Sequence, residues 1–388
     1  MKYPDRYFIL FTILTLGLAY TATDIYLPAL PDIQQHFAVT INQAQYTLSA
    51  YLFGLAFAQL IAGPIIDSIG YRRVLLPLLL TFITITLICA LSPNIFFLII
   101  MRCLQALAAG IISVLARASF IKRFDPANAG YILATFGPFL VLSGVFAPVI
   151  GGFIAHYLHW QGIFIILALY SMLILLANFR YFHVNESIPE LTYLKPKYIL
   201  TTYFTILKHR EFLQCILVNC MALGTLFTYV AESPFIYHQA GYTDKEIGLS
   251  FIPLSIGFLL ASQLNRLWYH KLKMNSILKI AVSLIILGLV IMSMPALLHG
   301  FYIIAIFGIA ITAFGLGLST PIAFGKATTL FPQQAGYAAG ILTAIPFIFS
   351  VLLTLIVHPI CSNNIMLLAI FLALVTFICM VIYYLLKR

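Results

Sequence analysis

Residues 63–73 read Gly63-Pro-Ile-Ile-Asp67-Ser-Ile-Gly70-Tyr-Arg72-Arg73 and link two apolar runs, at about 44–66 and 74–92. The glycines permit a tight turn, and the carboxylate of Asp67 can cap a helix. The two arginines place positive charge at the break, as short cytoplasmic loops do. Each flanking run has the roughly 20 apolar residues that a helix needs to cross a bilayer. The stretch therefore predicts a short polar loop between two membrane-spanning helices.

The composition extends this prediction to the whole chain. Of 388 residues, 62% are hydrophobic and only 8% are charged, and the mean hydropathy is +1.04. A soluble domain carries about 25% charged residues, so this chain cannot coat a water-facing surface of its size. A soluble enzyme, a nucleic-acid-binding domain and a disordered scaffold are excluded. The net charge of +10 does not indicate nucleic acid, because the basic residues gather in short breaks between apolar runs.

Twelve apolar runs can be separated at polar, Gly/Pro and basic breaks, which predicts an all-α membrane protein with twelve spans. The longest polar stretch divides them six and six: residues 1–182 form an N-terminal half, 183–210 a cytoplasmic linker and 211–388 a C-terminal half. The predicted spans lie at about 7–30, 44–66, 74–92, 95–117, 128–154, 160–182, 212–237, 246–265, 275–295, 301–323, 335–357 and 364–386.

The placement of basic residues predicts the orientation. With the N-terminus inside, 19 of the 21 Lys and Arg fall on the inner side, Lys245 falls outside and Arg102 lies within a span. Cytoplasmic loops carry the excess of Lys and Arg in multi-pass proteins. We therefore expect both termini to be cytoplasmic.

Three charged residues lie well inside predicted spans, away from the span ends: Asp24, Arg102 and Glu232. A charge at the bilayer centre costs about 3 kcal/mol or more on insertion scales, so such residues face a cavity or a partner. At 1.5 Å per residue, all three are expected roughly 8–10 Å below the outer surface. Asp24 and Arg102 are interpreted either as a proton-coupling pair or as a structural ion pair. Glu232 is interpreted as a group for coupling or for substrate selectivity.

Neighbouring polar and aromatic residues share helix faces with these charges. Tyr20 lies one turn before Asp24, Gln105 lies on the face of Arg102, and Tyr229 lies on the face of Glu232. Such faces can line a wet, partly apolar cavity. The predicted substrate-binding residues are Tyr20, Tyr26, Gln105, Tyr229 and Glu232.

Other functional classes have little support in the sequence. No HExxH, GxSxG or paired catalytic acids occur, so we do not expect an enzyme, and no P-loop indicates ATP-driven transport. His156 and His159 have no nearby acidic or cysteine ligand, and the six cysteines show no CxxC spacing. We therefore expect no metal site, disulfide framework or cofactor. The apolar N-terminus is interpreted as an uncleaved first span.

Several motifs resemble those of the major facilitator superfamily. The opening stretch, 63–73, is similar to its signature loop, with Ser68 and Tyr71 at two usually basic positions. The fourth span resembles the motif whose arginine is linked to proton coupling, and the fifth resembles the motif of drug/proton antiporters. These two stretches read Arg102-Cys-Leu-Gln105 and Gly144-Val-Phe-Ala-Pro148-Val-Ile-Gly151-Gly152. The resemblance implies that Gly63, Asp67, Gly70, Arg72, Arg73, Gly144, Pro148, Gly151 and Gly152 act in conformational change.

Finer similarities point to the Bcr/CflA drug-resistance transporters. Thr23-Asp24-Ile-Tyr26-Leu-Pro28-Ala-Leu-Pro31 resembles their first-helix signature, and Ser233-Pro234-Phe235 resembles a segment of their seventh helix. This chain departs from that pattern at Glu232, where a small residue is usual, and at Leu16, where some relatives carry a further acid.

The resemblance implies a proton-coupled exporter of small amphipathic or drug-like compounds. It also implies a bacterial-type inner membrane, with lipid and protons as partners, monomeric action, and no nucleic acid. Two alternatives remain open at this point. One is export of a specific metabolite, such as an amino acid, sugar or siderophore, on the same scaffold. The other is an intramembrane enzyme or a receptor.

Overall fold

The computed structural model describes residues 3–69, 71–123, 126–181, 196–268, 274–296, 302–331, 334–361 and 364–387, and these form helices joined by short turns. The helices of the first half are α1 (Tyr3–Asp24), η1 (Leu27–Ala29), α2 (Leu30–Phe37), α3 (Ile41–Ile69), α4 (Tyr71–Ala90), α5 (Ile95–Arg123) and α6 (Pro126–Tyr181). The helix α7 (Pro196–Leu207) precedes the second half. That half contains α8 (Arg210–Gln239), α9 (Asp244–Trp268), α10 (Met274–Ser293), η3 (Met294–Ala296), α11 (Tyr302–Leu330), α12 (Ala335–Cys361) and α13 (Ile365–Lys387).

Within the described ranges, eleven of these helices have 20 residues or more, and α6 consists of two helices merged across a kink at His159. The resulting twelve long helices correspond to the twelve predicted runs. The twelve-span all-α architecture is therefore confirmed. By length and hydropathy, the described residues contain ten stretches able to cross a membrane, one of which covers both sides of the α6 kink.

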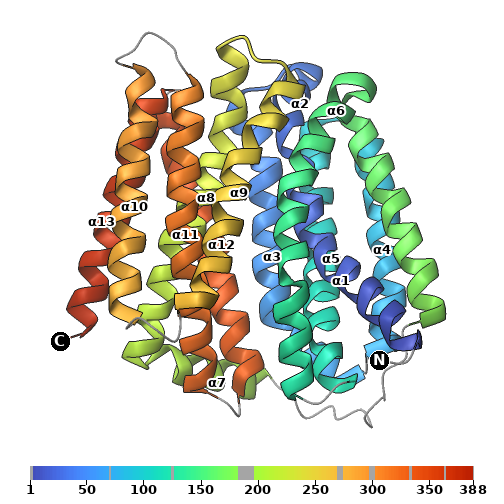
Figure 1. Ribbon diagram of the computed structural model, residues 1–388. Coiled ribbons are helices and arrows are strands. Elements are labelled where there is room, and N and C mark those ends of the chain that lie inside the picture. The colour runs from blue at the N-terminus through green and yellow to red at the C-terminus, as the bar shows by residue number, and fades with distance from the viewer. Residues whose placement is uncertain are drawn as a thin grey trace.

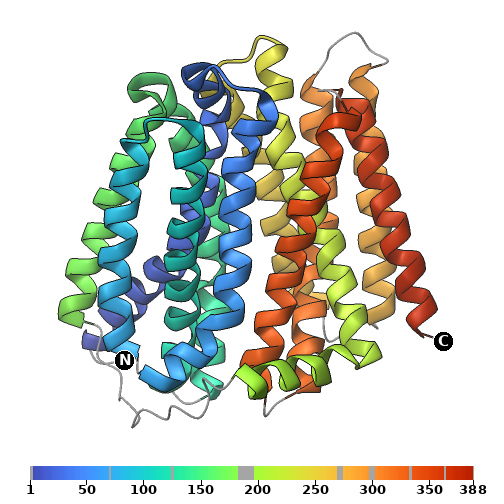
Figure 2. The same cartoon turned by 180° about the vertical axis from the view of Figure 1, so that it is seen from behind.

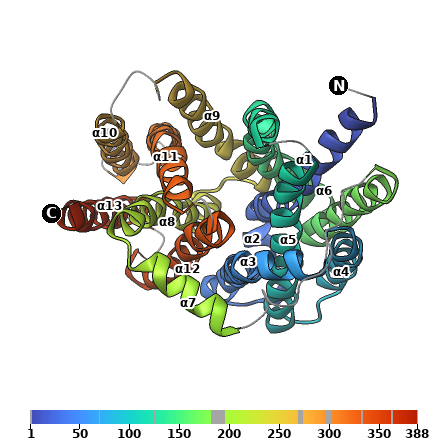
Figure 3. The ribbon, with the colours of Figure 1, turned by 90° about the horizontal axis from the view of Figure 1, so that it is seen from below.

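The long helices stand roughly parallel in two adjacent bundles, α1–α6 and α8–α13 (Figures 1 and 2). Seen from below, α7 crosses the end of the molecule beside α12 (Figure 3). The bundles meet where α3 packs on α12 and where α6 packs on α9. Both chain termini lie at the same end of the molecule as α7 (Figure 1).

Large apolar side chains cover the outside of the bundles. Leu91, Phe96 and Leu169 are 80%, 70% and 62% exposed, respectively. Soluble monomers rarely expose continuous apolar surface of this extent, whereas lipid tails solvate it without cost. The exterior therefore agrees with a multi-pass membrane protein.

The first span is not one continuous helix, which corrects the uninterrupted run predicted over 7–30. Helix α1 ends at Asp24, and the short η1 and α2 follow. Pro28 explains the break, because its ring would clash with the carbonyl of Asp24 four residues earlier in a regular helix. Asp24 consequently stands at a helix end next to irregular backbone.

The α6 kink is held by a residue from α2. His159 has a φ of 57°, a left-handed conformation that is uncommon outside glycine. Asp32 Oδ2 accepts a hydrogen bond from the Trp160 backbone N–H at 2.8 Å, at the start of the second helix of α6. The carboxylate thus satisfies one of the amides that every helix leaves open at its N-terminus.

Part of the predicted signature falls outside the described residues. Gly70 and the positions of Gly63, Asp67, Arg72 and Gly144 lie there as far as side chains are concerned, as does the part 183–195 of the predicted linker at 183–210. Arg73 is described and exposed. The domain boundaries at 182 and 211 therefore stay predictions.

Candidate transport site

The Arg102 side chain is fully buried in the N-terminal bundle, on α5. Its guanidinium carbon lies 4.1 Å from the centre of the Tyr26 ring and 4.0 Å from that of Tyr51. Both distances are well within the 6 Å range of cation–π attraction. Tyr51 comes from α3, and Tyr26 comes from the break after α1. The arginine therefore joins three segments of this bundle through aromatic faces.

Hydrogen bonds satisfy only part of the Arg102 guanidinium. Nη1 donates to Gln105 Oε1 at 2.7 Å and to the carbonyl of Ala22 at 3.4 Å. Gln105 in turn donates to Thr86 Oγ1 at 2.8 Å. Nε and Nη2 have no hydrogen-bond partner among the described residues. The N–H groups of Arg102 Nε and Nη2 can therefore still donate to a hydrogen-bond acceptor such as a carboxylate.

Asp24 does not supply that acceptor. Its side chain is partly exposed, and in the described part of the chain no basic group lies within 4.0 Å of its carboxylate. Tyr20, one turn earlier on α1, is also partly exposed. Asp24 and Arg102, expected at similar depth, are therefore separate groups in this conformation.

Glu232 is the buried charged residue of the C-terminal bundle, on α8. Its side chain is 1% exposed, and Oε2 lies 3.2 Å from Nδ1 of His358 on α12. Oε1 has no partner among the described side chains. His358 was missed by sequence reasoning because 126 residues separate it from Glu232. A histidine near the end of an apolar run was the one available signal.

Most of the predicted substrate-binding residues are buried in this conformation. The hydroxyl of Tyr26 lies 2.6 Å from Thr47 Oγ1, and that of Tyr229 lies 2.8 Å from the hydroxyl of Tyr237. Gln105 and Glu232 are buried as described above, and Tyr20 alone of the five is partly exposed. Their assignment to substrate binding stays a prediction.

Close helix contacts surround the described part of the fifth-span motif. A Cβ atom added at Gly151 would overlap the backbone of Ile25, and one at Gly152 would overlap the backbone of Asp244 on α9. A Cβ atom added at Gly248 on α9 would likewise lie 2.6 Å from the carbonyl oxygen of Pro148 and 3.2 Å from Cα of Gly152. Small residues allow such backbone approach between membrane helices. The motif thus lies at the contact between the two bundles.

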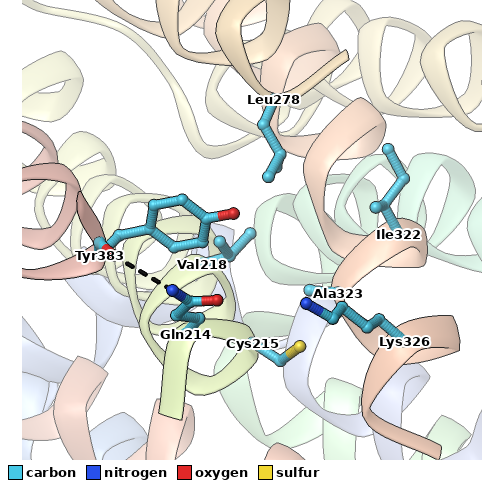
Figure 4. Close-up of a pocket in the computed structure, with 8 residues that line it drawn as sticks. All are labelled: Gln214, Cys215, Val218, Leu278, Ile322, Ala323, Lys326 and Tyr383. Atoms are coloured by element: carbon cyan, nitrogen blue, oxygen red, sulfur yellow. Dashed lines mark hydrogen bonds between the residues drawn. The ribbon is translucent and has the colours of Figure 1, made fainter. Parts of the chain in front are cut away.

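A small pocket lies elsewhere, inside the C-terminal bundle (Figure 4). It is lined by residues of α8, α10, α11 and α13, among them Gln214, Lys326 and Tyr383. It encloses only about 10 Å³, room for about one water molecule, whereas ligand pockets usually measure about 300–1,000 Å³. None of the predicted site residues lines it. Among the described residues, no group of three His, Cys, Asp or Glu could hold a metal ion.

The sequence profile of the Major Facilitator Superfamily matches residues 12–354. The chain belongs to this superfamily. The match runs from within α1 to within α12, so the superfamily assignment rests on the sequence of both bundles. The predicted resemblance is confirmed.

Curated relatives of this major facilitator include proteins named for drug resistance. The bicyclomycin resistance protein homolog of Haemophilus influenzae is 26% identical over 341 residues, covering 86% of this chain and 85% of the relative. The multidrug resistance protein MdtL of Vibrio parahaemolyticus is 27% identical over 336 residues, covering 83% and 81%. An uncharacterized MFS-type transporter of Bacillus subtilis, YdgK, is 28% identical over 352 residues, covering 88% and 85%.

Solved structures of other transporters share the fold. The xylose transporter XylE from Escherichia coli, in a partially occluded inward open conformation, superimposes with a TM-score of 0.76 over 99% of this chain and 98% of that one. The sequence identity is 14%, so this similarity concerns the arrangement of helices alone.

Proposed function

We propose that this major facilitator exports small, amphipathic, drug-like compounds in exchange for protons. The observation that carries the proposal is the pair of separate charged groups in the N-terminal bundle. Arg102 is buried with two open donors, whereas Asp24 is partly exposed and has no basic partner within 4.0 Å in the described part of the chain. The names of the drug-resistance relatives support drug-like substrates.

Asp24 is the proposed proton carrier. A protonated carboxyl no longer carries the cost of a charge in the membrane, so proton binding favours the conformation in which Asp24 is more enclosed. An ionised Asp24 is attracted toward the open Nε and Nη2 donors of Arg102 and favours a different position of the α1 end. The break at Asp24 gives this segment freedom to move independently of the rest of α1.

Coupling follows when the substrate and the proton bias these conformations in opposite directions. A ligand shifts an equilibrium only by its difference in affinity for the two states. A mostly apolar cavity with few polar groups binds many amphipathic compounds weakly. Export of one specific metabolite would instead require a fixed set of hydrogen bonds to that molecule.

We also propose that both termini and α7 face the cytoplasm of a bacterial-type inner membrane. Single cysteines in a cysteine-free background test this orientation. A cysteine at Lys208, which is exposed just after α7, should react with a membrane-impermeant maleimide only from the cytoplasmic side. A cysteine at Lys245, at the opposite end of the molecule, should react only from outside. Reversed labelling would contradict the orientation.

Transport in liposomes tests the function. The purified chain is reconstituted with a defined pH gradient, and uptake is measured for a panel of cationic, neutral and zwitterionic amphipaths together with amino acids and sugars. We expect several unrelated amphipaths to accumulate when the gradient is present and to equilibrate when it is collapsed. Accumulation of a single polar metabolite class, or accumulation that ignores the gradient, would contradict the proposal.

A further inference from the structure

Helix α8 carries buried polar groups whose hydrogen bonds are not satisfied. The hydroxyls of Thr225 and Thr228 and the Oε1 atom of Glu232 are buried and have no partner in the described part of the chain. Steps of three and four residues place all three on one face of the helix. A buried polar group without a partner is unfavourable, because it has lost its hydrogen bonds to water and gained none in return. Three on one face indicate a polar ligand that this conformation lacks.

The α8 threonines differ from most other buried threonines of the chain. Thr86, Thr312 and Thr354, for example, donate to the carbonyl four residues earlier at 2.6–3.1 Å. That local bond is the usual way for a helical threonine to satisfy its hydroxyl. Thr225 and Thr228 make no such bond, so their hydroxyls stay available to a group beside α8.

Glu232 gives this face a negative charge, and His358 occupies only half of its carboxylate. Oε2 contacts His358 Nδ1 at 3.2 Å, while Oε1 remains open. In the described part of the chain, His358 is the one basic side chain within 4.0 Å of Glu232. Histidine is the side chain whose charge changes between about pH 5 and pH 8. The strength with which His358 holds the carboxylate therefore depends on its proton.

The other titratable residues near this pair on α8 and α12 are a cysteine, two tyrosines and His238, whose Nε2 lies 3.2 Å from Nε2 of Gln35 on α2. Cys361 on α12 interacts electrostatically with Glu232. Tyr229 and Tyr237 lie on α8 itself, and Tyr237 contacts the ring of Tyr302 on α11 at 5.9 Å between centroids. In the described part of the chain, none of these groups is a basic partner of Glu232 within 4.0 Å.

We propose that Thr225, Thr228 and Glu232 form a binding site for a protonated amine of the substrate, and that His358 holds the Glu232 carboxylate while this site is empty. The ligand class follows from the chemistry: two hydroxyls and a carboxylate oxygen can together accept the three N–H bonds of an ammonium group. The inference rests on the proposed export of amphipathic compounds and assigns the cationic members of that class to α8.

The exchange at Glu232 balances one cation against one proton. When the ammonium group binds Oε1, a protonated His358 on Oε2 stands beside a second positive charge, and the repulsion favours release of the His358 proton to water. The carboxylate keeps its charge throughout, and no covalent bond to carbon forms or breaks. Substrate binding and protonation of His358 therefore oppose each other.

Opening of the two bundles would uncover the site. Gln45 on α3 donates to the carbonyl of Ala231, the residue before Glu232, at 3.2 Å. This hydrogen bond joins the two bundles directly beside the carboxylate. Movement of α3 away from α8 would therefore expose Glu232 to the space between the bundles.

Equilibrium binding to the full chain in lipid nanodiscs tests the site with two matched probes. 4-Phenylbutylamine carries the ammonium group, and 4-phenylbutan-1-ol has nearly the same shape without charge. We expect wild type to bind the amine about five- to thirtyfold more tightly than the alcohol, the effect of one partly desolvated ion pair. In Glu232→Gln, the amine and the alcohol should bind with about equal affinity. Thr225→Val with Thr228→Val, which keeps side-chain shape, should weaken amine binding about five- to thirtyfold and leave the alcohol unchanged.

His358→Gln separates the role of the histidine from that of the carboxylate. In wild type, acidification should lower amine affinity, because a protonated imidazole beside Glu232 opposes binding of the ammonium group. In His358→Gln this fall should disappear, and His209→Gln, an exposed histidine at the other end of α8, should behave like wild type. An unchanged amine-to-alcohol ratio in Glu232→Gln, an unchanged pH dependence in His358→Gln, or no amine binding by wild type would overturn the site. Gradient-driven export of neutral compounds in liposomes would still support the proposed function.

Discussion

The two bundles handle a buried charge in opposite ways. In the N-terminal bundle, the buried group is the cation Arg102, which lies between the rings of Tyr26 and Tyr51 and has no acidic partner within 4.0 Å among the described residues. In the C-terminal bundle, the buried group is the anion Glu232, which is held by His358 on a neighbouring helix. The N-terminal site therefore has a buried cation with aromatic partners. The C-terminal site has a buried anion with a histidine partner.

This difference indicates that the two bundles have different roles in transport. A guanidinium keeps its proton in proteins, so Arg102 can attract or release a carboxylate without changing its own charge. Asp24, partly exposed at a helix end, is then the group that carries the proton in the N-terminal bundle. The histidine beside Glu232 can gain or lose charge, which suits a site that discriminates among cations.

Loss of Arg102 should have the largest effect on transport. In Arg102→Ala, the attraction for ionised Asp24 disappears, and we expect gradient-driven transport in liposomes to fall to the level of protein-free vesicles. The removed contacts lie within one bundle, so the protein should still insert and remain monodisperse. Transport above background would count against a coupling role for Arg102.

A double variant distinguishes coupling from a structural ion pair. If Asp24 and Arg102 mainly compensated each other's charge, Asp24→Asn with Arg102→Gln would recover transport, because no charge is left without a partner. We expect no recovery, because the two groups are not within 4.0 Å of each other in the described conformation. Robust gradient-driven transport by the double variant would reverse this interpretation.

Enlarging the glycine contact between the bundles should have the next largest effect. In Gly152→Ala, the new Cβ would overlap the backbone of Asp244. Overpacking of this kind costs about 1–3 kcal/mol, which shifts the balance between closed and open bundles about 5- to 150-fold. The shift is measured as faster maleimide labelling of a cysteine at Gln45. Gly336→Ala is the matched control, since its Cβ meets no atom within 4 Å. Equal labelling of both variants would show that this contact does not control opening.

Removing the charge of Glu232 should have the smallest effect and the most selective one. Glu232→Gln keeps the shape of the side chain and should weaken the apparent affinity for transported cations by about 1–2 kcal/mol, or five- to thirtyfold. Transport of neutral compounds should persist, because Asp24 and Arg102 remain. If transport of neutral and cationic compounds falls equally, Glu232 acts in coupling or in structure. That result would contradict the assignment of cation selectivity to the C-terminal bundle.

The fold could be predicted from the sequence because hydropathy along the chain determines which segments cross the membrane. The run expected at 212–237 is the helix α8 over Arg210–Gln239, and the run at 364–386 is α13 over Ile365–Lys387. The break after Asp24 was not predicted. The local steric effect of Pro28 interrupts the helix there, inside the run expected at 7–30.

The site was only partly predictable, because depth along a helix does not determine contacts between helices. The expected depths of Asp24 and Arg102 are similar, yet rotation of each helix decides which side chains meet. Arg102 contacts Tyr26 and Tyr51 instead, and Gln105 is occupied by Arg102 and Thr86. The partner of Glu232, His358, comes from a helix four spans later.

Counterflow and accumulation by Asp24→Asn test the central claim, that Asp24 couples transport to the proton gradient. Counterflow exchanges substrate across the membrane without a gradient, so it needs substrate binding and opening of the bundles but no proton exchange. The account predicts that Asp24→Asn in liposomes retains counterflow of a neutral amphipath near the wild-type rate and loses accumulation of that compound driven by a pH gradient. Gradient-driven accumulation by Asp24→Asn at the wild-type level would contradict the account.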